Sequence, residues 1–353
     1  MTPNTIIHGD ALTELRKLPD ECVDCIITSP PYWGLRDYGV AGQLGLEESP
    51  EEYVARMVEV FREVRRVLRN DGTLWLNIGD SYAATRKGGP QGKNGARADR
   101  RFVASVSAKM GDGLKNKDLV GIPWMLAFAL RADGWYLRQD IIWSKPNPMP
   151  ESVTDRCTKA HEYIFLVTKS QKYYFDNKAV QELAVYGGVE ERLARQKDDM
   201  KSSPTAKKNG IRRRVSFAEP LAEATVNRGK SGKWESAPNA KLSKGVIGMT
   251  PDSFNKAVKT MLEKGTRNRR SVWTVNTAPF KEAHFATFPE KLIEPMVLAG
   301  TPPKGIVLDP FMGAGTTALV AKKLGRQYIG IELNPEYIKM AEKRLRNIPN
   351  PLF

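Results

Sequence analysis

The sequence predicts an α/β fold built on a parallel sheet. In the first half of the chain and near its end, short apolar runs alternate with segments of helical periodicity, which is typical of such sheets. Between these parts, residues 176–276 lose the periodicity and become basic. We therefore expect a sheet domain made from residues 1–175 and 277–353, with residues 176–276 as an insertion.

The individual elements follow from apolar spacing and from their end signals. Strands are predicted at residues 5–10, 25–28, 73–78, 136–146 and 161–170, and helices at residues 49–72, 121–135 and 288–300. The helix at 49–72 is the best marked, since Ser49 suits the N-cap, Pro50 the first position and Glu52 a capping box. Asn70-Asp71-Gly72 is expected to stop it.

Two further stretches complete the order of elements. Residues 83–117 are rich in Gly, Lys, Arg and Ser, which predicts a long loop. Residues 305–345 predict a strand, a glycine-rich turn, a helix, a strand and a second helix.

Charge indicates a polyanionic partner. The net charge is +15, and residues 188–282 alone hold 21 Lys or Arg against 10 Asp or Glu. No basic amphipathic helix stands out, so nucleic acid is favoured over a membrane surface.

Hydropathy and cysteine usage favour the cytoplasm. Hydrophobic residues make up 41% of the chain, and neither a membrane-length apolar run nor a signal-peptide pattern is present. Three cysteines do not make a disulfide framework. Cys22 and Cys25 form a C-x-x-C without a second pair, so we expect no metal site.

The stretch CIITSPPYWG, residues 25–34, places a stiff corner at the end of a strand. Pro30 and Pro31 donate no backbone hydrogen bonds and hold the chain extended, while Tyr32 and Trp33 add aromatic rings. Such a corner offers fixed carbonyl acceptors beside a stacking surface. It suits a flat base held by its exocyclic amine after the base has left the duplex.

A second motif, VLDPFMGAGTTA, predicts a strand, a glycine turn and a helix. Gly313 and Gly315 would let a ligand approach the backbone, and the helix start offers free N–H groups. Glu332 ends the next strand, where an acidic residue can hold ribose hydroxyls. An adenosyl cofactor is therefore expected, either NAD or S-adenosylmethionine. The proline-containing corner favours S-adenosylmethionine, since a dehydrogenase has no need of it.

TSPPYW together with DPFMGAGTT resembles the catalytic and cofactor motifs of the bacterial DNA amino-methyltransferases. The order of the motifs resembles the β group of that family, and WSKPNPMPESVTDRCTKAHEYIFLVTKS resembles a further block. The resemblance implies a Rossmann-like methyltransferase sheet, S-adenosylmethionine as cofactor, double-stranded DNA as substrate and a homodimer as the assembly. No restriction partner can be named from it.

The resemblance also implies roles for individual residues. Ser29 and the Pro30 carbonyl would hold the target amine beside Pro31, and Tyr32 would stack on the flipped base with help from Trp33. The cofactor would contact Asp10, Phe285, Asp309, Phe311, Gly313, Gly315, Thr317 and Glu332. Purely structural alternatives are open for two of these, since Asp309 could end its strand and Asp10 could cap a helix.

Ser29 leaves the target base open. Most adenine enzymes of this family have Asp or Asn at this position, whereas the serine form is associated with cytosine N4 enzymes but also occurs in adenine enzymes. Methylation at cytosine C5 is disfavoured, because no cysteine follows the proline in the way that a thiolate nucleophile requires. An RNA or protein methyltransferase, an NAD-binding dehydrogenase and a silent DNA-binding module are the alternative classes.

The basic insertion is expected to recognise the target site. Basic residues that could neutralise phosphates or read guanine are Lys207, Lys208, Arg212, Arg213, Arg214, Arg267, Arg269 and Arg270. A solvated surface without a ligand is the alternative for this segment.

Overall fold

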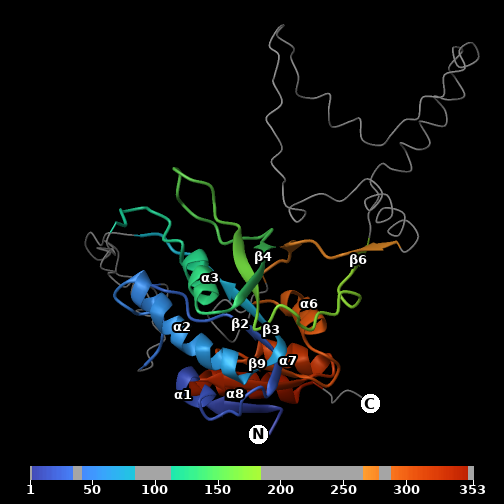
Figure 1. Ribbon diagram of the computed structural model, residues 1–353. Helices are drawn as coiled ribbons and strands as arrows, with labels where there is room; N and C mark the ends of the chain where they lie inside the picture. The colour runs from blue at the N-terminus through green and yellow to red at the C-terminus, as the bar shows by residue number, and fades with distance from the viewer. Residues whose placement is uncertain (1, 35–41, 84–112, 184–264, 278–287, 349–353) are drawn as a thin grey trace, which may run out of the picture. The chain divides into compact units, whose positions relative to one another are not determined.

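The computed structural model describes residues 2–34, 42–83, 113–183, 265–277 and 288–348 (Figure 1). It divides the chain into two compact units, residues 1–181 with 268–353 and residues 182–267. In the second unit, β6 (Glu182–Leu183) pairs antiparallel with β7 (Thr266–Arg267). The second unit is shorter than the predicted insertion, because residues 176–181 and 268–276 belong to the first unit.

The first unit is built on an eight-stranded sheet with the order β1-β10-β9-β2-β3-β5-β4-β8. Its strands are β1 (Thr5–His8), β2 (Val23–Thr28), β3 (Leu68–Ile78), β4 (Tyr136–Ser144), β5 (His161–Thr168), β8 (Val272–Thr274), β9 (Ile306–Asp309) and β10 (Gln327–Glu332). All neighbours pair in parallel except β5, which is antiparallel to both β3 and β4.

The sheet is therefore mixed, and the prediction of a parallel sheet was wrong at β5. A parallel neighbour of β4 would need a long crossover, usually a helix. Residues 145–160, all of them described, contain no helix, so the chain turns back and β5 pairs antiparallel. β8 was not predicted at all, and it lies at the edge of the sheet beside β4.

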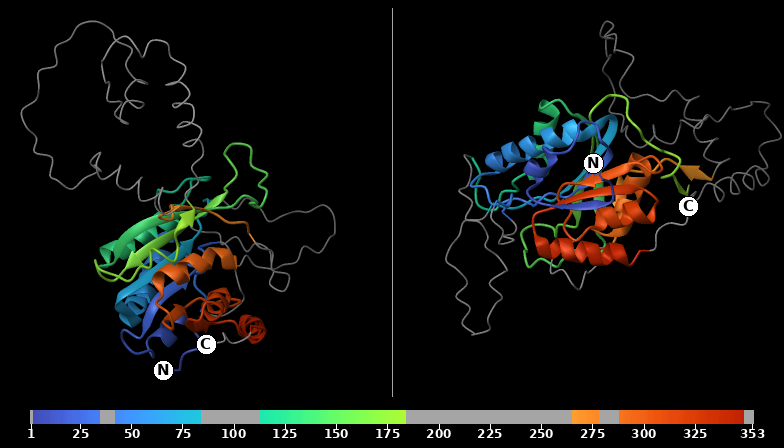
Figure 2. Two further views of the ribbon diagram at one scale, coloured as in Figure 1. Left: turned by 90° about the vertical axis from the view of Figure 1, so that its right-hand side faces the viewer. Right: turned by 90° about the horizontal axis from the view of Figure 1, so that it is seen from below.

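Helices cover both faces of the sheet (Figure 2). One face packs against α1 (Ala11–Leu15), α2 (Pro50–Val67) and α3 (Ile122–Ala132), and the other against α6 (Glu290–Gly300), α7 (Thr316–Lys323) and α8 (Pro335–Arg346). Successive residues of β2 serve the two faces in turn. Ile26 lies in the core on the α2 face and Ile27 in the core on the α6 face, as the alternation of a strand requires.

The predicted start of α2 is confirmed and its predicted end is wrong. The Ser49 side chain accepts a hydrogen bond from the Glu52 backbone N–H at 3.1 Å, and Pro50 is the first helical residue. The helix ends at Val67, and β3 runs from Leu68 through Asn70-Asp71-Gly72. Leu68 is fully buried and pairs with Val23 of β2, so sheet pairing overrides the local stop signal.

The length of the helices and the surroundings of the cysteines also relate to the sequence predictions. Among the described helices, none is both long and apolar enough to cross a membrane. Burial raises the pKa of both Cys22 and Cys25, to about 11 for Cys25. Within the described ranges, no three His, Cys, Asp or Glu side chains gather in a way that could hold a metal ion.

Candidate active site

The two predicted motifs meet at the carboxyl ends of two neighbouring strands in the middle of the sheet. We call residues 29–32 the proline corner and residues 311–317 the glycine turn. The corner follows β2 and the turn follows β9, and these strands are parallel neighbours. The chain continues from β2 to β3 on one side and from β9 to β10 on the other. Open α/β sheets bind their ligands at such a reversal of direction.

A buried carboxylate joins the two motifs. Asp309, which is 1% exposed, accepts hydrogen bonds from the Oγ1 atoms of Thr28 and Thr317, each at 2.7 Å. The Phe311 backbone N–H donates to the same carboxylate at 3.1 Å. Burial raises the pKa of Asp309 to about 6. Asp309 and Thr317 thus brace β2, β9 and α7 from inside, whereas the sequence predicted that both line the cofactor.

The glycine turn combines a close packing contact with an open position. Gly313 and Gly315 have φ angles of +53° and +78°, in the left-handed region that favours glycine. A Cβ built on Gly315 would lie 2.7 Å from the Cβ of Ala341 on α8. No atom of the described residues lies within 4 Å of a Cβ built on Gly313, so a ligand can reach the backbone there.

Glu332 lies against the glycine turn. Its carboxylate accepts the Gly313 N–H at 2.7 Å and the Asn334 N–H at 2.8 Å. Burial raises the pKa of Glu332. Each carboxylate oxygen has a second lone pair, which suits the hydroxyls of a ribose. The open turn and this carboxylate therefore fit an adenosyl group.

The proline corner presents acceptors whose positions are fixed. The hydroxyl of Tyr53, a fully buried residue of α2, donates to the Pro31 carbonyl at 2.8 Å. Within the part of the chain that the structure describes, the Pro30 carbonyl receives no hydrogen bond. Pro30 is buried, and its carbonyl lies next to the Ser29 hydroxyl as a second acceptor in the corner.

Tyr32 has its ring and hydroxyl held by neighbouring residues. The hydroxyl donates to Oε2 of Glu162 at 2.8 Å, and the Ser29 Oγ contacts the same hydroxyl at 3.4 Å. A Cβ at Gly79 would come within 2.6 Å of the ring, so glycine makes room for it. Burial, followed by the charge of Glu162, raises the pKa of Tyr32 well above its usual value, which keeps the phenol neutral.

Glu162 and its partners are site residues that sequence reasoning missed. Asn77 of β3 donates through Nδ2 to Oε2 of Glu162 at 3.1 Å, and Lys145 forms an ion pair with Oε1. The Lys145 ammonium also lies 4.3 Å from the centroid of the Trp143 ring. A usable signal exists in the sequence for Asn77, because this polar residue interrupts the apolar run of β3, whereas Glu162 lies at the polar start of β5.

Two of the predicted site residues have structural partners. Trp33 is 4% exposed in the core, and its indole N–H donates to the Glu47 carbonyl at 3.0 Å. A ring buried in this way is not presented to a base. Asp10 caps α1, since its carboxylate accepts from the Thr13 N–H at 2.9 Å and the Thr13 hydroxyl at 2.8 Å.

The basic residues predicted to bind DNA are only partly described. Arg267 forms an ion pair with Glu182 at 2.8 Å. The Arg269 guanidinium lies 4.6 Å from the centroid of the Trp273 ring, and the Arg270 carbonyl accepts the Trp273 indole N–H at 2.8 Å. The predicted cofactor residue Phe285 and the predicted DNA-binding residues Lys207, Lys208, Arg212, Arg213 and Arg214 lie outside the described residues.

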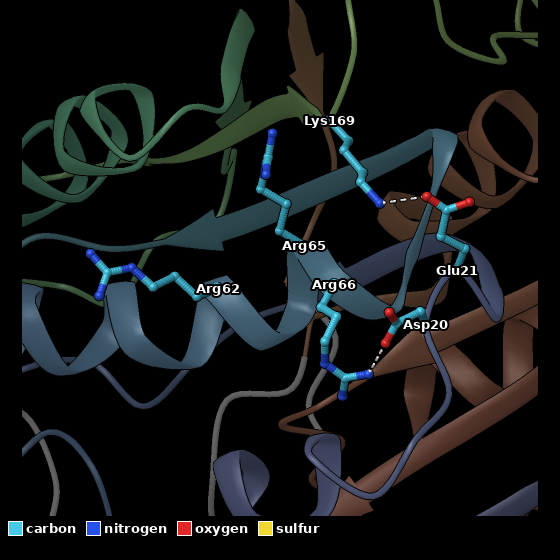
Figure 3. Close-up of a pocket in the computed structure, with 6 residues that line it drawn as sticks. All are labelled: Asp20, Glu21, Arg62, Arg65, Arg66 and Lys169. Carbon is cyan, nitrogen blue, oxygen red and sulfur yellow. Dashed lines mark hydrogen bonds and ion pairs between the residues drawn. The ribbon is translucent and has the colours of Figure 1, made fainter.

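A charged cavity lies near the start of β2, at the end of this strand opposite to the proline corner (Figure 3). Its volume is about 330 Å³, and it is lined by Asp20, Glu21, Arg62, Arg65, Arg66 and Lys169. Arg66 pairs with Asp20 at 2.5 Å and Lys169 with Glu21 at 3.0 Å. These ion pairs neutralise much of the wall, and the cavity contains no residue of the two motifs.

Comparison with known proteins identifies the family. The family model described as DNA methylase matches residues 23–343. The chain is 45% identical to the type II methyltransferase M.Cfr9I of Citrobacter freundii, over 97% of this chain and 87% of that protein. It is 40% identical to M.SmaI of Serratia marcescens, over 96% of this chain and 90% of the relative.

Solved structures agree with the fold. The PvuII DNA methyltransferase, described as cytosine-N4-specific, superposes with a TM-score of 0.54 at 19% identity, covering 100% of this chain and 89% of that one. TTHA0409 of Thermus thermophilus, in complex with S-adenosyl-L-methionine, gives a TM-score of 0.51 at 20% identity, covering 98% and 95%. The chain belongs to the N6/N4 DNA methylase family, the S-adenosylmethionine-dependent enzymes that methylate amino groups of DNA bases.

Proposed function

We propose that the proline corner is where this enzyme holds the exocyclic amine of a flipped cytosine or adenine. Ser29 and the Pro30 carbonyl accept the two N–H groups of that amine, and the Tyr32 ring stacks on the base. The observation that carries the proposal is the Pro30 carbonyl, which is fixed beside Ser29 by two prolines and receives no hydrogen bond from the described residues.

The chemistry needs acceptors of this kind. The lone pair of an exocyclic amine is conjugated into the ring of the base, which makes the nitrogen a poor nucleophile. Two acceptors placed out of the ring plane draw the N–H bonds toward tetrahedral geometry and free the lone pair. Because proline fixes the backbone, the acceptors keep their positions without reorganising during the reaction.

The cofactor supplies an activated methyl group when it is bound. We propose that Gly313 and Gly315 bring the backbone close to it and that Glu332 accepts its ribose hydroxyls. Phe311 and, from the resemblance alone, Asp10 and Phe285 complete the set. The open space at Gly313 and the position of Glu332 support this assignment.

We also propose that residues 182–267 recognise a specific duplex site and that the enzyme is the modification half of a type II restriction–modification pair. The charge of this segment and the names of the relatives support the proposal. Replacing Arg212, Arg213 and Arg214 with Ala should weaken DNA binding. It should also flatten the salt dependence of binding, by about 0.9 in log slope for each phosphate that these arginines neutralise in the wild type. An unchanged slope would remove these arginines from the interface.

Methylation mapping tests the function directly. The gene is expressed in cells without endogenous DNA methylation, and the genomic DNA is sequenced with modification-sensitive reads. We expect N4-methylcytosine or N6-methyladenine at one short sequence motif, and the reads distinguish the two bases. Unmodified DNA from cells that contain folded, cofactor-binding enzyme would refute the proposal.

The assembly and the location are also proposals. From the family resemblance, we propose that the enzyme forms a homodimer and works in the cytoplasm on chromosomal DNA. Light scattering on the purified protein distinguishes a monomer from a dimer, and a monomer at working concentration would contradict the first part. Methylated chromosomal sites in the mapping experiment would support the second.

A further inference from the structure

Three polar side chains form a hydrogen-bonded chain that begins at the proposed amine acceptor. The Ser29 hydroxyl donates to the Tyr32 hydroxyl over 3.4 Å, and the Tyr32 hydroxyl donates to Oε2 of Glu162 over 2.8 Å. Ser29 and Tyr32 belong to the proline corner, whereas Glu162 comes from β5. The chain therefore connects the corner to a carboxylate on a different strand.

We propose that Ser29, Tyr32 and Glu162 form a proton path that removes the proton lost by the target amine, with Glu162 as the final acceptor. This inference rests on the proposed function, because it requires the amine to be bonded to Ser29. As nitrogen gains the methyl group, one N–H bond breaks and its electron pair stays on nitrogen. That proton passes to the Ser29 Oγ, the Ser29 proton passes to the Tyr32 oxygen, and the Tyr32 proton passes to Glu162.

The direction of the path follows from the surroundings of Tyr32. Its single hydroxyl proton has two possible acceptors, Oε2 of Glu162 at 2.8 Å and Oδ1 of Asn77 at 3.3 Å. The shorter contact to an ionised group is the stronger hydrogen bond. Asn77 donates through Nδ2 to Glu162 and to the Tyr163 carbonyl, each at 3.1 Å, so its amide is held in one orientation.

Glu162 is suited to be the end of the path. Its side chain is 16% exposed, which leaves it a route for returning the proton to solvent. The titratable groups around it are Tyr32 in the corner, Lys145 at the end of β4, and Lys159, whose Nζ donates to the Asp80 carbonyl at 2.9 Å. Asp80 lies near Lys159. Tyr53 lies near Tyr32. The ion pair with Lys145 fixes the position of the carboxylate that would receive the proton.

Two variants interrupt the path while keeping its shape. Tyr32→Phe removes the hydroxyl and keeps the stacking ring, and Glu162→Gln keeps the size of the acceptor and removes its basicity. We expect each to lower the single-turnover rate of methyl transfer by about 100-fold, the usual scale of acid–base catalysis, with cofactor and DNA affinity unchanged. The double variant should be no slower than either single variant. Glu290→Gln breaks an exposed ion pair with Lys323 and serves as the matched control with the normal rate.

Rescue and pH dependence separate a proton path from mere positioning of Tyr32. Added formate or acetate should restore the rate of Glu162→Ala and should not restore that of Tyr32→Phe. The wild-type rate should fall at low pH, and this acid limb of the pH profile should be absent from Glu162→Gln. A normal rate for Tyr32→Phe would overturn the proposal even if Glu162→Ala did not fold.

The proposed function and the proton path fail in different ways. If the wild-type enzyme leaves DNA unmethylated, the proposed function fails. If the wild type methylates DNA and Glu162→Gln keeps both its rate and its acid limb, only the proton path fails.

Discussion

The proline corner and the glycine turn follow two neighbouring strands at their carboxyl ends, and they use the backbone in opposite ways. The corner is stiff and offers a carbonyl and a hydroxyl, which are acceptors for a donor amine. The turn has two residues with positive φ and leaves the Gly313 backbone open to a ligand. We therefore propose that proline supplies fixed acceptors for the base and that glycine allows close approach of the cofactor.

Each motif also has its own carboxylates. Asp309, between the motifs, is buried and shared by two threonines and a backbone N–H, so it serves the fold. Glu332 at the turn and Glu162 behind the corner remain near the places where ligands are proposed. Position in the sheet thus separates the acid with structural partners from the two acids that we propose to act on ligands.

Asp309 should make the stability of the fold depend on pH, because burial raises its pKa. Its pKa of about 6 in the folded state exceeds its usual 3.8, so the folded state binds more protons between pH 4 and 6, and stability falls as pH rises there. Two pKa units correspond to about 3 kcal/mol. We compare the free energy of unfolding of Asp309→Asn with that of the wild type at each pH. We expect this difference to shift in favour of the variant by about the same amount as the pH rises from 4 to 7. Urea unfolding at both pH values measures it, and parallel pH curves would contradict it.

Tyr32→Ala should affect the base and spare the cofactor. This variant loses the stacking ring, which is worth about 1–3 kcal/mol, and also the hydroxyl of the proposed proton path, so the rate at saturating cofactor should fall by at least about 100-fold. Calorimetry should show unchanged cofactor affinity. A variant that no longer binds cofactor would make Tyr32 a structural residue.

Glu332→Ala should weaken cofactor binding and leave the handling of the base unchanged. Removal of the carboxylate takes away the proposed acceptors of two ribose hydroxyls, which should weaken cofactor binding by about 1–3 kcal/mol. At saturating cofactor, methyl transfer should return close to the wild-type rate. Unchanged affinity would remove Glu332 from the cofactor site.

Gly79→Ala should have the smallest effect on the rate of methyl transfer among these variants. The new methyl group would lie 2.6 Å from the Tyr32 ring, which must rotate or shift. A displaced rotamer costs about 1 kcal/mol, so we expect the transfer rate to drop roughly fivefold with normal cofactor binding. A normal rate would show that the orientation of the ring is unimportant.

The sequence predicts the parts of this molecule that depend on local chemistry. The start of α2 at Ser49 and Pro50 follows from neighbouring residues, and the predicted strands at residues 5–10, 25–28, 73–78, 136–146 and 161–170 each overlap an observed strand. The antiparallel β5 was missed because strand direction depends on the connection over residues 145–160. The early end of α2 was missed because the sheet, not the local sequence, decides where Leu68 pairs.

The site shows the same division. The proline corner and the glycine turn are contiguous motifs, so both could be found. Glu162 could not be joined to Tyr32 from the sequence, because the two residues meet only after β2, β3 and β5 have paired. Trp33 and Thr317 were assigned to ligands because a motif gives residue types but does not show which side chains the core takes in.

One paired measurement can show whether the proline corner serves the base and the glycine turn serves the cofactor. Cofactor affinity and the single-turnover rate at saturating cofactor are measured side by side for Tyr32→Ala and Glu332→Ala. We predict that Tyr32→Ala keeps the affinity and loses the rate, while Glu332→Ala loses affinity and keeps the rate. If both variants lose both properties together, or if the two patterns are exchanged, the division between the proline corner and the glycine turn is wrong.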